Sequence, residues 1–376
     1  MTTSTEVAII GGGVAGCATA YYLAKAGITS TIIEREGISS QSSGYNAGGL
    51  NPLQGAGIPG PLAPLAAESF ELHQGLAQSL QEESGIEFHP RMVTMVKVAF
   101  DESEFAEMQE TLDIFQGAEG FSAHWLETED ILKIDSRINP EAIKGLYTYG
   151  NASLSGFEYT VALSKAAERM GAIIRIGTAT GIKTTGKRVT GVVLQDGDLS
   201  CNAVVIATGP WSRQAETWLG VKIPVQPLKG EIVRVRPIGE LPEQDFSGAG
   251  SSLYMRANGL IWIGGVGNES EEGFDKNPTP AAKKMLLDGA YKLMPALAGV
   301  QIVKHTACLR PVTTDWLPII GNAPGWENVY LATGAGKKGI LISPGMGKAT
   351  ADLITKGKTN LSVDKFGLER FIRERP

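Results

Sequence analysis

Apolar residues form two short runs near the start of the chain, with a glycine-rich turn and a stretch of small residues between them. Residues 6–10 predict a buried strand, residues 17–26 predict a helix that ends at Gly27, and residues 29–34 predict a second strand. The segment between the first strand and the helix is Gly-Gly-Gly-Val-Ala-Gly. This order makes a βαβ unit of about 30 residues, which is typical of α/β folds.

The same periodicity predicts elements along the rest of the chain. Helices are expected at 65–84, 101–115, 156–171, 278–293 and 345–356. Strands are expected at 88–100, 173–176, 180–183, 189–194 and 201–208, and several more within 221–265, where Asn258-Gly259 marks a hairpin. Residues 39–61 are rich in Ser, Gly, Asn and Pro and predict a long loop, and loops of this length are usually functional.

Composition narrows the class of protein. A chain of 376 residues with 43% hydrophobic content is long for one core, so two domains are expected. The net charge of −6 argues against nucleic acid as a partner. No apolar stretch is long enough for a transmembrane helix, and the N-terminus lacks the pattern of a signal peptide. The three cysteines are Cys17, Cys201 and Cys308, which favour neither disulfides nor a metal site; a reducing, cytoplasmic location fits best.

The glycine motif has the context of a dinucleotide-binding fingerprint. Gly11, Gly13 and Gly16 follow a strand and open a helix, and Glu34 ends the next strand. The helix N-terminus suits a pyrophosphate, and a carboxylate at Glu34 suits ribose hydroxyls and disfavours a 2′-phosphate. The residues expected to contact the nucleotide are Gly11, Gly13, Val14, Ala15, Gly16, Glu34 and Arg35.

The fingerprint alone does not separate FAD from NAD. The loop from Ser39 to Gly49 resembles the serine-rich, Asn-Ala-Gly-containing loop of the D-amino-acid-oxidase-type flavoprotein family. In that family the loop follows the pyrophosphate and passes under the isoalloxazine ring, so the resemblance implies FAD as the cofactor. The loop contacts that it implies are Ser42, Ser43, Asn46, Ala47, Gly48, Gly49 and Leu50.

Further segments resemble motifs of the same family in the same order along the chain. They lie at 207–212, 227–231, 309–315 with 318–321, and 334–341 with 344–347. Several motifs in order are more specific than one. The additional cofactor contacts that the resemblance implies are Thr208, Gly209, Trp211, Gly336, Lys337, Lys338, Gly339 and Ile340.

The resemblance also implies the architecture. A Rossmann-like FAD-binding domain of the α/β class is expected to comprise residues 1–85, 150–220 and 305–376. An α+β substrate-binding domain with a mixed sheet is expected to comprise residues 86–149 and 221–304.

Three side chains are the expected substrate contacts. In family members that act on amino acids, the arginine at the position of Arg310 pairs with the substrate carboxylate, and a guanidinium fork suits two carboxylate oxygens. Tyr254 matches a tyrosine that hydrogen-bonds the carboxylate in members such as glycine oxidase, although Met255 and Arg256 depart from the usual pattern after it. Lys337 matches a second basic position, and its neighbour Lys338 is an alternative.

Cys308 precedes the Leu-Arg-Pro motif, where many members have glycine. The monomeric sarcosine oxidase branch has a cysteine here that is bonded to the flavin. Covalent FAD is therefore one hypothesis, and a small buried cysteine that behaves as a hydrophobe is the other. The histidine-containing final turn of that branch is missing, so non-covalent FAD is the default expectation.

The expected function is an FAD-dependent oxidation of a small amine-bearing carboxylate such as glycine, sarcosine or a D-amino acid. In the family a hydride passes to flavin N5, and the resulting imine hydrolyses to an oxo acid. A 2-hydroxy-acid dehydrogenase and an FAD-bearing subunit of a hetero-oligomeric amine or opine oxidase are the alternatives. Oxygen or an electron carrier as the acceptor, the exact substrate, and a homo-oligomeric state stay open.

Overall fold

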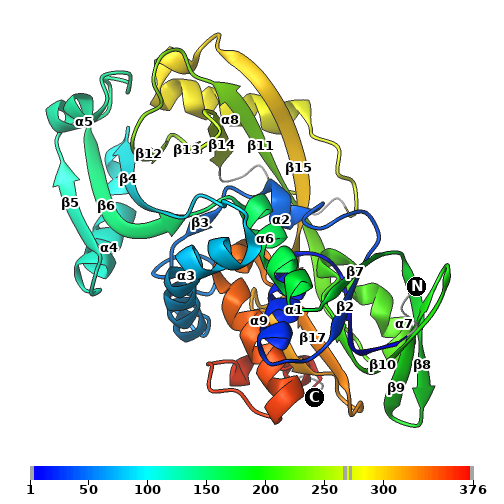
Figure 1. Cartoon of the computed structure of the whole chain (residues 1–376). Helices are drawn as coiled ribbons and strands as arrows, with labels where there is room; N and C mark the ends of the chain where they lie inside the picture. Colours follow the sequence, from blue (N-terminus) through cyan, green and yellow to red (C-terminus); the bar gives the residue numbers. More distant parts are fainter. Residues whose placement is uncertain (1–3, 266–268, 271–272, 373–376) are drawn as a thin grey trace.

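The computed structural model of the chain describes residues 4–265, 269–270 and 273–372. Two β-sheets form its framework, and helices cover them to give a mixed α/β architecture (Figure 1). Among the described residues, no helix combines the length and the apolar character that crossing a membrane requires.

The first sheet has eight strands, and its core is parallel. The order is β16-β17-β10-β1-β2-β7, with β9 beside β10 and β8 beside β9. All neighbouring pairs from β17 to β7 along this order are parallel. The strands are β1 (Ser4–Ile10), β2 (Ser30–Glu34), β7 (Ile173–Ile176), β8 (Ala179–Thr185), β9 (Arg188–Leu194), β10 (Gly197–Ile206), β16 (Ile319–Asn322) and β17 (Val329–Thr333).

Both faces of this sheet are buried, which explains its continuous apolar strands. In β1, Val7 and Ile9 belong to a core shared with the helices, whereas Ala8 and Ile10 belong to a core on the opposite face. Successive side chains of a strand point to opposite faces, so one strand supplies both cores. The helices that contact one another on the first face are α1 (Val14–Lys25), α3 (Ala63–Ser84), α6 (Gly156–Arg169) and α9 (Gly339–Lys356).

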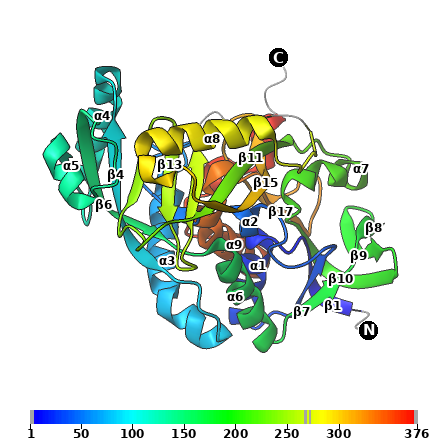
Figure 2. The same cartoon turned by 90° about the horizontal axis from the view of Figure 1, so that it is seen from above.

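The second sheet has nine strands and is mixed. Its order is β15-β11-β14-β13-β12-β4-β6-β3, with β5 beside β6, and β12 and β4 form its parallel pair. Helix α8 (Pro280–Leu293) packs across β11, β13 and β14 (Figure 2). The strands are β3 (Gly49–Leu50), β4 (Arg91–Ala99), β5 (Ser122–Leu126), β6 (Lys144–Ser153), β11 (Val225–Arg236), β12 (Asp245–Gly248), β13 (Ser251–Met255), β14 (Ile261–Gly265) and β15 (Gln301–Thr313).

The remaining helices are short or peripheral. Helices α4 (Phe105–Gln116) and α5 (Thr128–Ile134) lie beside β5 and β6, and α7 (Glu216–Leu219) follows a 3₁₀ segment. The predicted loop at 39–61 contains one helical turn, α2 (Ser42–Tyr45), and the short strand β3. The predicted domain boundary at residue 305 falls inside β15, so a single strand crosses it. The division into two domains stays a prediction.

The C-terminal helix corrects one sequence prediction. A start at residue 345 is wrong, because α9 begins at Gly339 and contains Pro344. Proline removes the hydrogen bond to the carbonyl four residues earlier and usually ends a helix. Here the Ile340 carbonyl accepts instead from His73 Nε2 at 2.9 Å and from Ser343 Oγ at 2.8 Å. The substitute donors satisfy the buried carbonyl, so the helix continues through the proline.

His73 predicts a pH dependence of stability. Burial lowers its pKa from 6.5 to about 4, so the folded chain keeps the ring neutral where the unfolded chain protonates it. The stability that depends on the neutral ring is complete above about pH 6.5 and is lost as the pH falls toward 4.

His73→Gln keeps an N–H donor that does not titrate. We expect the stability advantage of wild type over this variant to fall by about 2 kcal/mol between pH 7 and pH 5. Chemical denaturation at both pH values measures it, and an advantage that does not change with pH would contradict this role.

Candidate active site

A cavity of about 440 Å³ lies where the two sheets meet. The first sheet lines the cavity with residues at the carboxyl ends of its parallel strands. Open α/β sheets bind ligands at this end of their strands. These strand-end residues are Ile10, Glu34, Gly177, Ala207 and Thr333. The second sheet contributes strand residues from β11, β13, β14 and β15, so the cavity is shared by both halves of the molecule.

The glycine fingerprint forms a tight turn at one wall. Gly11 has φ +115°, and a Cβ atom there would collide with the Ala207 carbonyl. A Cβ atom on Gly16 would collide with the Gly11 carbonyl, so this glycine lets α1 approach β1 closely. Val14 and Ala15, at the start of α1, line the cavity with Gly13.

Glu34 and Arg35 lie at the end of β2 and also line the cavity. Glu34 Oε2 accepts from the Gly12 N–H at 2.7 Å, and Oε1 accepts from the Glu36 N–H at 2.9 Å. The Arg35 guanidinium lies 4.2 Å from the centre of the Trp211 ring, an arrangement typical of a cation–π contact. The wall therefore presents an oriented carboxylate beside a flat aromatic surface.

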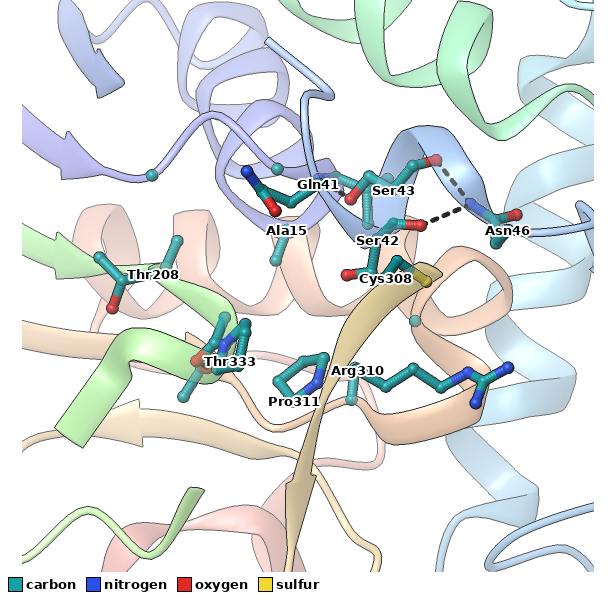
Figure 3. A pocket seen from close by; sticks show the side chains of 18 of the residues that line it. Ala15, Gln41, Ser42, Ser43, Asn46, Thr208, Cys308, Arg310, Pro311 and Thr333 are labelled. Atoms are coloured by element: carbon teal, nitrogen blue, oxygen red, sulfur yellow. Dashed lines mark hydrogen bonds between the residues drawn. The ribbon is translucent and has the colours of Figure 1, made fainter. Parts of the chain in front are cut away.

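The loop from Ser42 to Gly48 is held against the start of α1. Ser43 Oγ accepts from the Val14 N–H at 3.0 Å. The Asn46 side-chain amide donates to the carbonyls of Ser42 and Ser43, as the dashed lines in Figure 3 show, and its Oδ1 accepts from the Gly48 N–H at 2.7 Å. These bonds keep the loop along the cavity.

Arg256 ties this loop to the second sheet. Its guanidinium donates to the carbonyls of Ala47 and Met255 and pairs with the buried Asp245 carboxylate. An arginine at this position, two residues after Tyr254, departs from the family pattern, and these contacts show what it does in this chain. Arg256 connects the end of β13 to the loop that lines the cavity.

The chemistry of these walls fits FAD. Gly13, the N-cap of α1, has no side chain, and Ser43 Oγ accepts from the Val14 N–H. Within the described residues no side chain accepts from the N–H groups of Ala15 and Gly16, which can therefore meet an anion. The N-terminal residues of α9, Gly339 and Ile340, line the same cavity. A dinucleotide offers phosphates for helix N-termini and ribose hydroxyls for the Glu34 carboxylate. The cavity then continues to the second sheet.

Most of the residues expected to contact the cofactor line this cavity, and three do not. Gly16 packs against the Gly11 backbone, and Leu50 is buried in β3, where it pairs with β6. Lys338 points elsewhere, since its ammonium donates to the carbonyls of Asn51 and Gln54. Burial lowers its pKa to about 8. Lys338 therefore anchors residues 51–54, and Lys337 is the lysine of the pair that lines the cavity.

Arg310, Lys337 and Tyr254 all line the cavity, although they come from distant parts of the chain. Arg310 and Cys308 extend from β15, two residues apart and therefore on one face of the strand (Figure 3). A Cβ atom on Gly230 would collide with the Arg310 guanidinium, so this glycine makes room for it. The Arg310 guanidinium and the Lys337 ammonium both contact Glu269, which was not among the predicted site residues.

Arg310 Nη1 lies 2.9 Å from Glu269 Oε1, and Lys337 Nζ lies 2.7 Å from Glu269 Oε2. Glu269 begins an acidic stretch of sequence that is typical of a solvent-exposed loop. The residues next to it therefore do not indicate a role in a binding site. Further lining residues that were missed are Gln41, Tyr45, Thr178, Gln214, Trp218, Gly264 and Pro311.

Cys308 lines the cavity and is buried. Burial raises the pKa of its thiol, although Arg310 and Arg234 act in the opposite direction. The thiolate is the reactive form of cysteine, so this environment disfavours reaction. Within residues 4–265, 269–270 and 273–372, no group of three or more His, Cys, Asp or Glu side chains is arranged to hold a metal ion.

Comparison with known proteins agrees with this geometry. Residues 6–353 match the family model described as FAD dependent oxidoreductase. The chain belongs to this family of FAD-dependent oxidoreductases. It is therefore an oxidoreductase whose cofactor is FAD.

Relatives cover nearly the whole chain. Glycine oxidase of Geobacillus kaustophilus is 31% identical over 376 residues, which span 99% of this chain and 98% of that protein. D-amino acid dehydrogenase of Paramagnetospirillum magneticum is 25% identical over 97% of this chain and 99% of its own length. The crystal structure of glycine oxidase from Geobacillus kaustophilus superimposes with a TM-score of 0.90 at 28% identity, covering 98% of this chain and 99% of that one.

The buried thiol of Cys308 leads to a prediction about whether FAD is covalently bound. Because burial disfavours the thiolate, we expect FAD to be bound without a covalent link. Acid precipitation of the purified protein should leave the yellow flavin in the supernatant. Flavin that stays in the pellet of wild type, and leaves it in a Cys308→Ser variant, would contradict this expectation.

Proposed function

We propose that this enzyme oxidises a small amino acid whose carboxylate is bound by Arg310. The observation that carries the proposal is the position of the Arg310 guanidinium, which lines the same cavity as the fingerprint turn and the loop from Ser42 to Gly48. Relatives named glycine oxidase and D-amino acid dehydrogenase, similar over nearly the full chain, support a substrate of this class.

Arg310 has the donors that carboxylate binding needs. Its Nη1 atom is used by Glu269. Within the described part of the chain, its Nε and Nη2 atoms have no protein hydrogen-bond partner, so one planar edge of the fork stays available. Such an edge binds two carboxylate oxygens at once and sets the orientation of the substrate. Its side chain is 23% exposed, and this partial desolvation strengthens the pairing.

Tyr254 supplies a second polar group. It lies on β13, whose alternate residues Leu253 and Met255 are buried in the core under α8. Tyr254 therefore points to the other face of the sheet, toward the cavity that it lines. A phenol hydroxyl there donates to a carboxylate oxygen, so Arg310 and Tyr254 together hold the substrate by its acid group.

A fixed carboxylate leaves the α-carbon and its amine as the part of the substrate that reacts. FAD, when bound, would supply the hydride acceptor: loss of the α-hydride and of an amine proton would give an imine, which water would hydrolyse to an oxo acid and ammonia or an amine. The residues proposed to hold FAD are Gly11, Gly13, Val14, Ala15, Glu34, Arg35, Ser42, Ser43, Asn46, Ala47, Gly48, Gly49, Thr208, Gly209, Trp211, Gly336, Lys337, Gly339 and Ile340.

Substitution of Arg310 tests the proposal. Wild-type holoenzyme should oxidise at least one of glycine, sarcosine and the D-amino acids. Arg310→Ala should lower kcat/KM by about 100-fold, mainly through KM, because a charge-assisted pair with the carboxylate is lost. Arg310→Lys should fall between the two, since an ammonium cannot form the fork. Steady-state kinetics measure these values, and the visible spectrum checks that flavin stays bound.

Two outcomes would count against the proposal. Unchanged kinetics in Arg310→Ala would remove its role in binding the carboxylate. Oxidation of 2-hydroxy acids, with none of any amino acid, would assign the site to a different reaction class.

A further inference from the structure

The two cations that line the substrate end of the cavity share one acidic partner. Glu269 places one oxygen on Arg310 and the other on Lys337, at 2.9 Å and 2.7 Å. The Glu269 side chain is 19% exposed and that of Arg310 is 23% exposed, so their pair is partly desolvated, whereas the Lys337 side chain is 37% exposed. A single carboxylate spans both cations.

The backbone holds Glu269 in place. Ser270, the next residue, forms two hydrogen bonds with Lys229: Lys229 N–H donates to the Ser270 carbonyl at 2.9 Å, and Ser270 N–H donates to the Lys229 carbonyl at 3.2 Å. Lys229 directly precedes Gly230, which lies against the Arg310 guanidinium. The same stretch of β11 therefore positions both the acid and the space for the arginine.

Other charges that line the cavity are engaged elsewhere. Glu34 and Arg35 lie at the end of β2, where Glu34 contacts the fingerprint turn and Arg35 contacts Trp211. The Glu231 carboxylate accepts from the backbone and side chain of Thr279, at the N-terminus of α8. The Glu231 carboxylate keeps its charge and also lies 2.7 Å from His305 Nε2. The cluster that Arg310, Lys337 and Glu269 form with one another has a formal charge of +1.

Without Glu269 the same place would carry a charge of +2. A site of +1 balances one carboxylate, whereas a site of +2 would also attract a second one. We propose that Glu269 is a specificity-determining residue: it keeps Lys337 neutralised, so that the site accepts amino monocarboxylates and rejects amino dicarboxylates. This inference rests on the proposed function, because it assumes that Arg310 binds the substrate carboxylate.

The test uses the holoenzyme and two ions that cannot be oxidised. Acetate and malonate are titrated into wild type and Glu269→Gln, and the change in the visible flavin spectrum gives each Kd. We expect the ratio of the acetate Kd to the malonate Kd to rise about tenfold in Glu269→Gln, because the second carboxylate gains an unpaired cation. Glu243→Gln removes the same charge from an exposed glutamate outside the cavity lining and should leave the ratio at its wild-type value.

A double variant tests whether the charge of the site, and not the shape of the Glu269 side chain, changes the ratio of the Kd values. Glu269→Gln with Lys337→Gln returns the site to +1, so the ratio should return to its wild-type value. With substrates, Glu269→Gln should gain activity toward iminodiacetate relative to sarcosine by a similar factor.

Two results would overturn the role of Glu269. One is an unchanged ratio in Glu269→Gln, and the other is a ratio that stays raised in the double variant. Failure of the proposed function would look different: no amino acid would be oxidised by wild type, whereas the acetate and malonate titrations would still report the charge of the site.

Discussion

The antiparallel pairing of β11 and β15 is the constraint on which the site depends. In its register Gly230 lies opposite Cys308, and Leu228 lies opposite Arg310. Because side chains alternate along a strand, a shift of one residue would turn Arg310 away from the cavity and remove the space that Gly230 leaves for it. The chain then passes from β15 to β16 and β17 of the first sheet, so this pairing also fixes how the two sheets meet.

A second constraint is electrostatic. The cavity presents N-terminal residues of two helices, α1 and α9, together with Arg310 and Lys337. All of these favour negative charge. Glu269 meets Arg310 and Lys337 within the protein, and we propose that the FAD phosphates and the substrate carboxylate supply the other negative groups. The start of α9 at Gly339 depends in turn on His73 and Ser343, which donate to the Ile340 carbonyl that Pro344 cannot bind. A buried histidine that does not itself line the cavity thus helps to shape its wall.

Much of this could be predicted from the sequence. The βαβ unit, the fingerprint and Arg310 carry their information in adjacent residues, because strand, turn and helix signals are local. The start of α9 could not be predicted in this way, since Pro344 is a local stop signal, and His73, which compensates for it, lies 267 residues before Ile340, whose carbonyl it binds. Glu269 was missed for the same reason: its acidic surroundings indicate a surface loop, and only the fold brings it to Arg310. Lys337 and Lys338 are adjacent, and tertiary contacts alone decide that Lys338 turns to the carbonyls of Asn51 and Gln54.

We propose that the enzyme recognises an amino acid by its carboxylate through Arg310. The most direct measurement is anaerobic reduction of the wild-type flavin by the amino acid that bleaches it fastest, compared with the primary amide of the same amino acid. The amide keeps the amine and the α-carbon but lacks the negative charge. We expect the amide to reduce the flavin at least about 100-fold less efficiently, as loss of a charge-assisted pair requires. Equal reduction by the acid and the amide would contradict the claim.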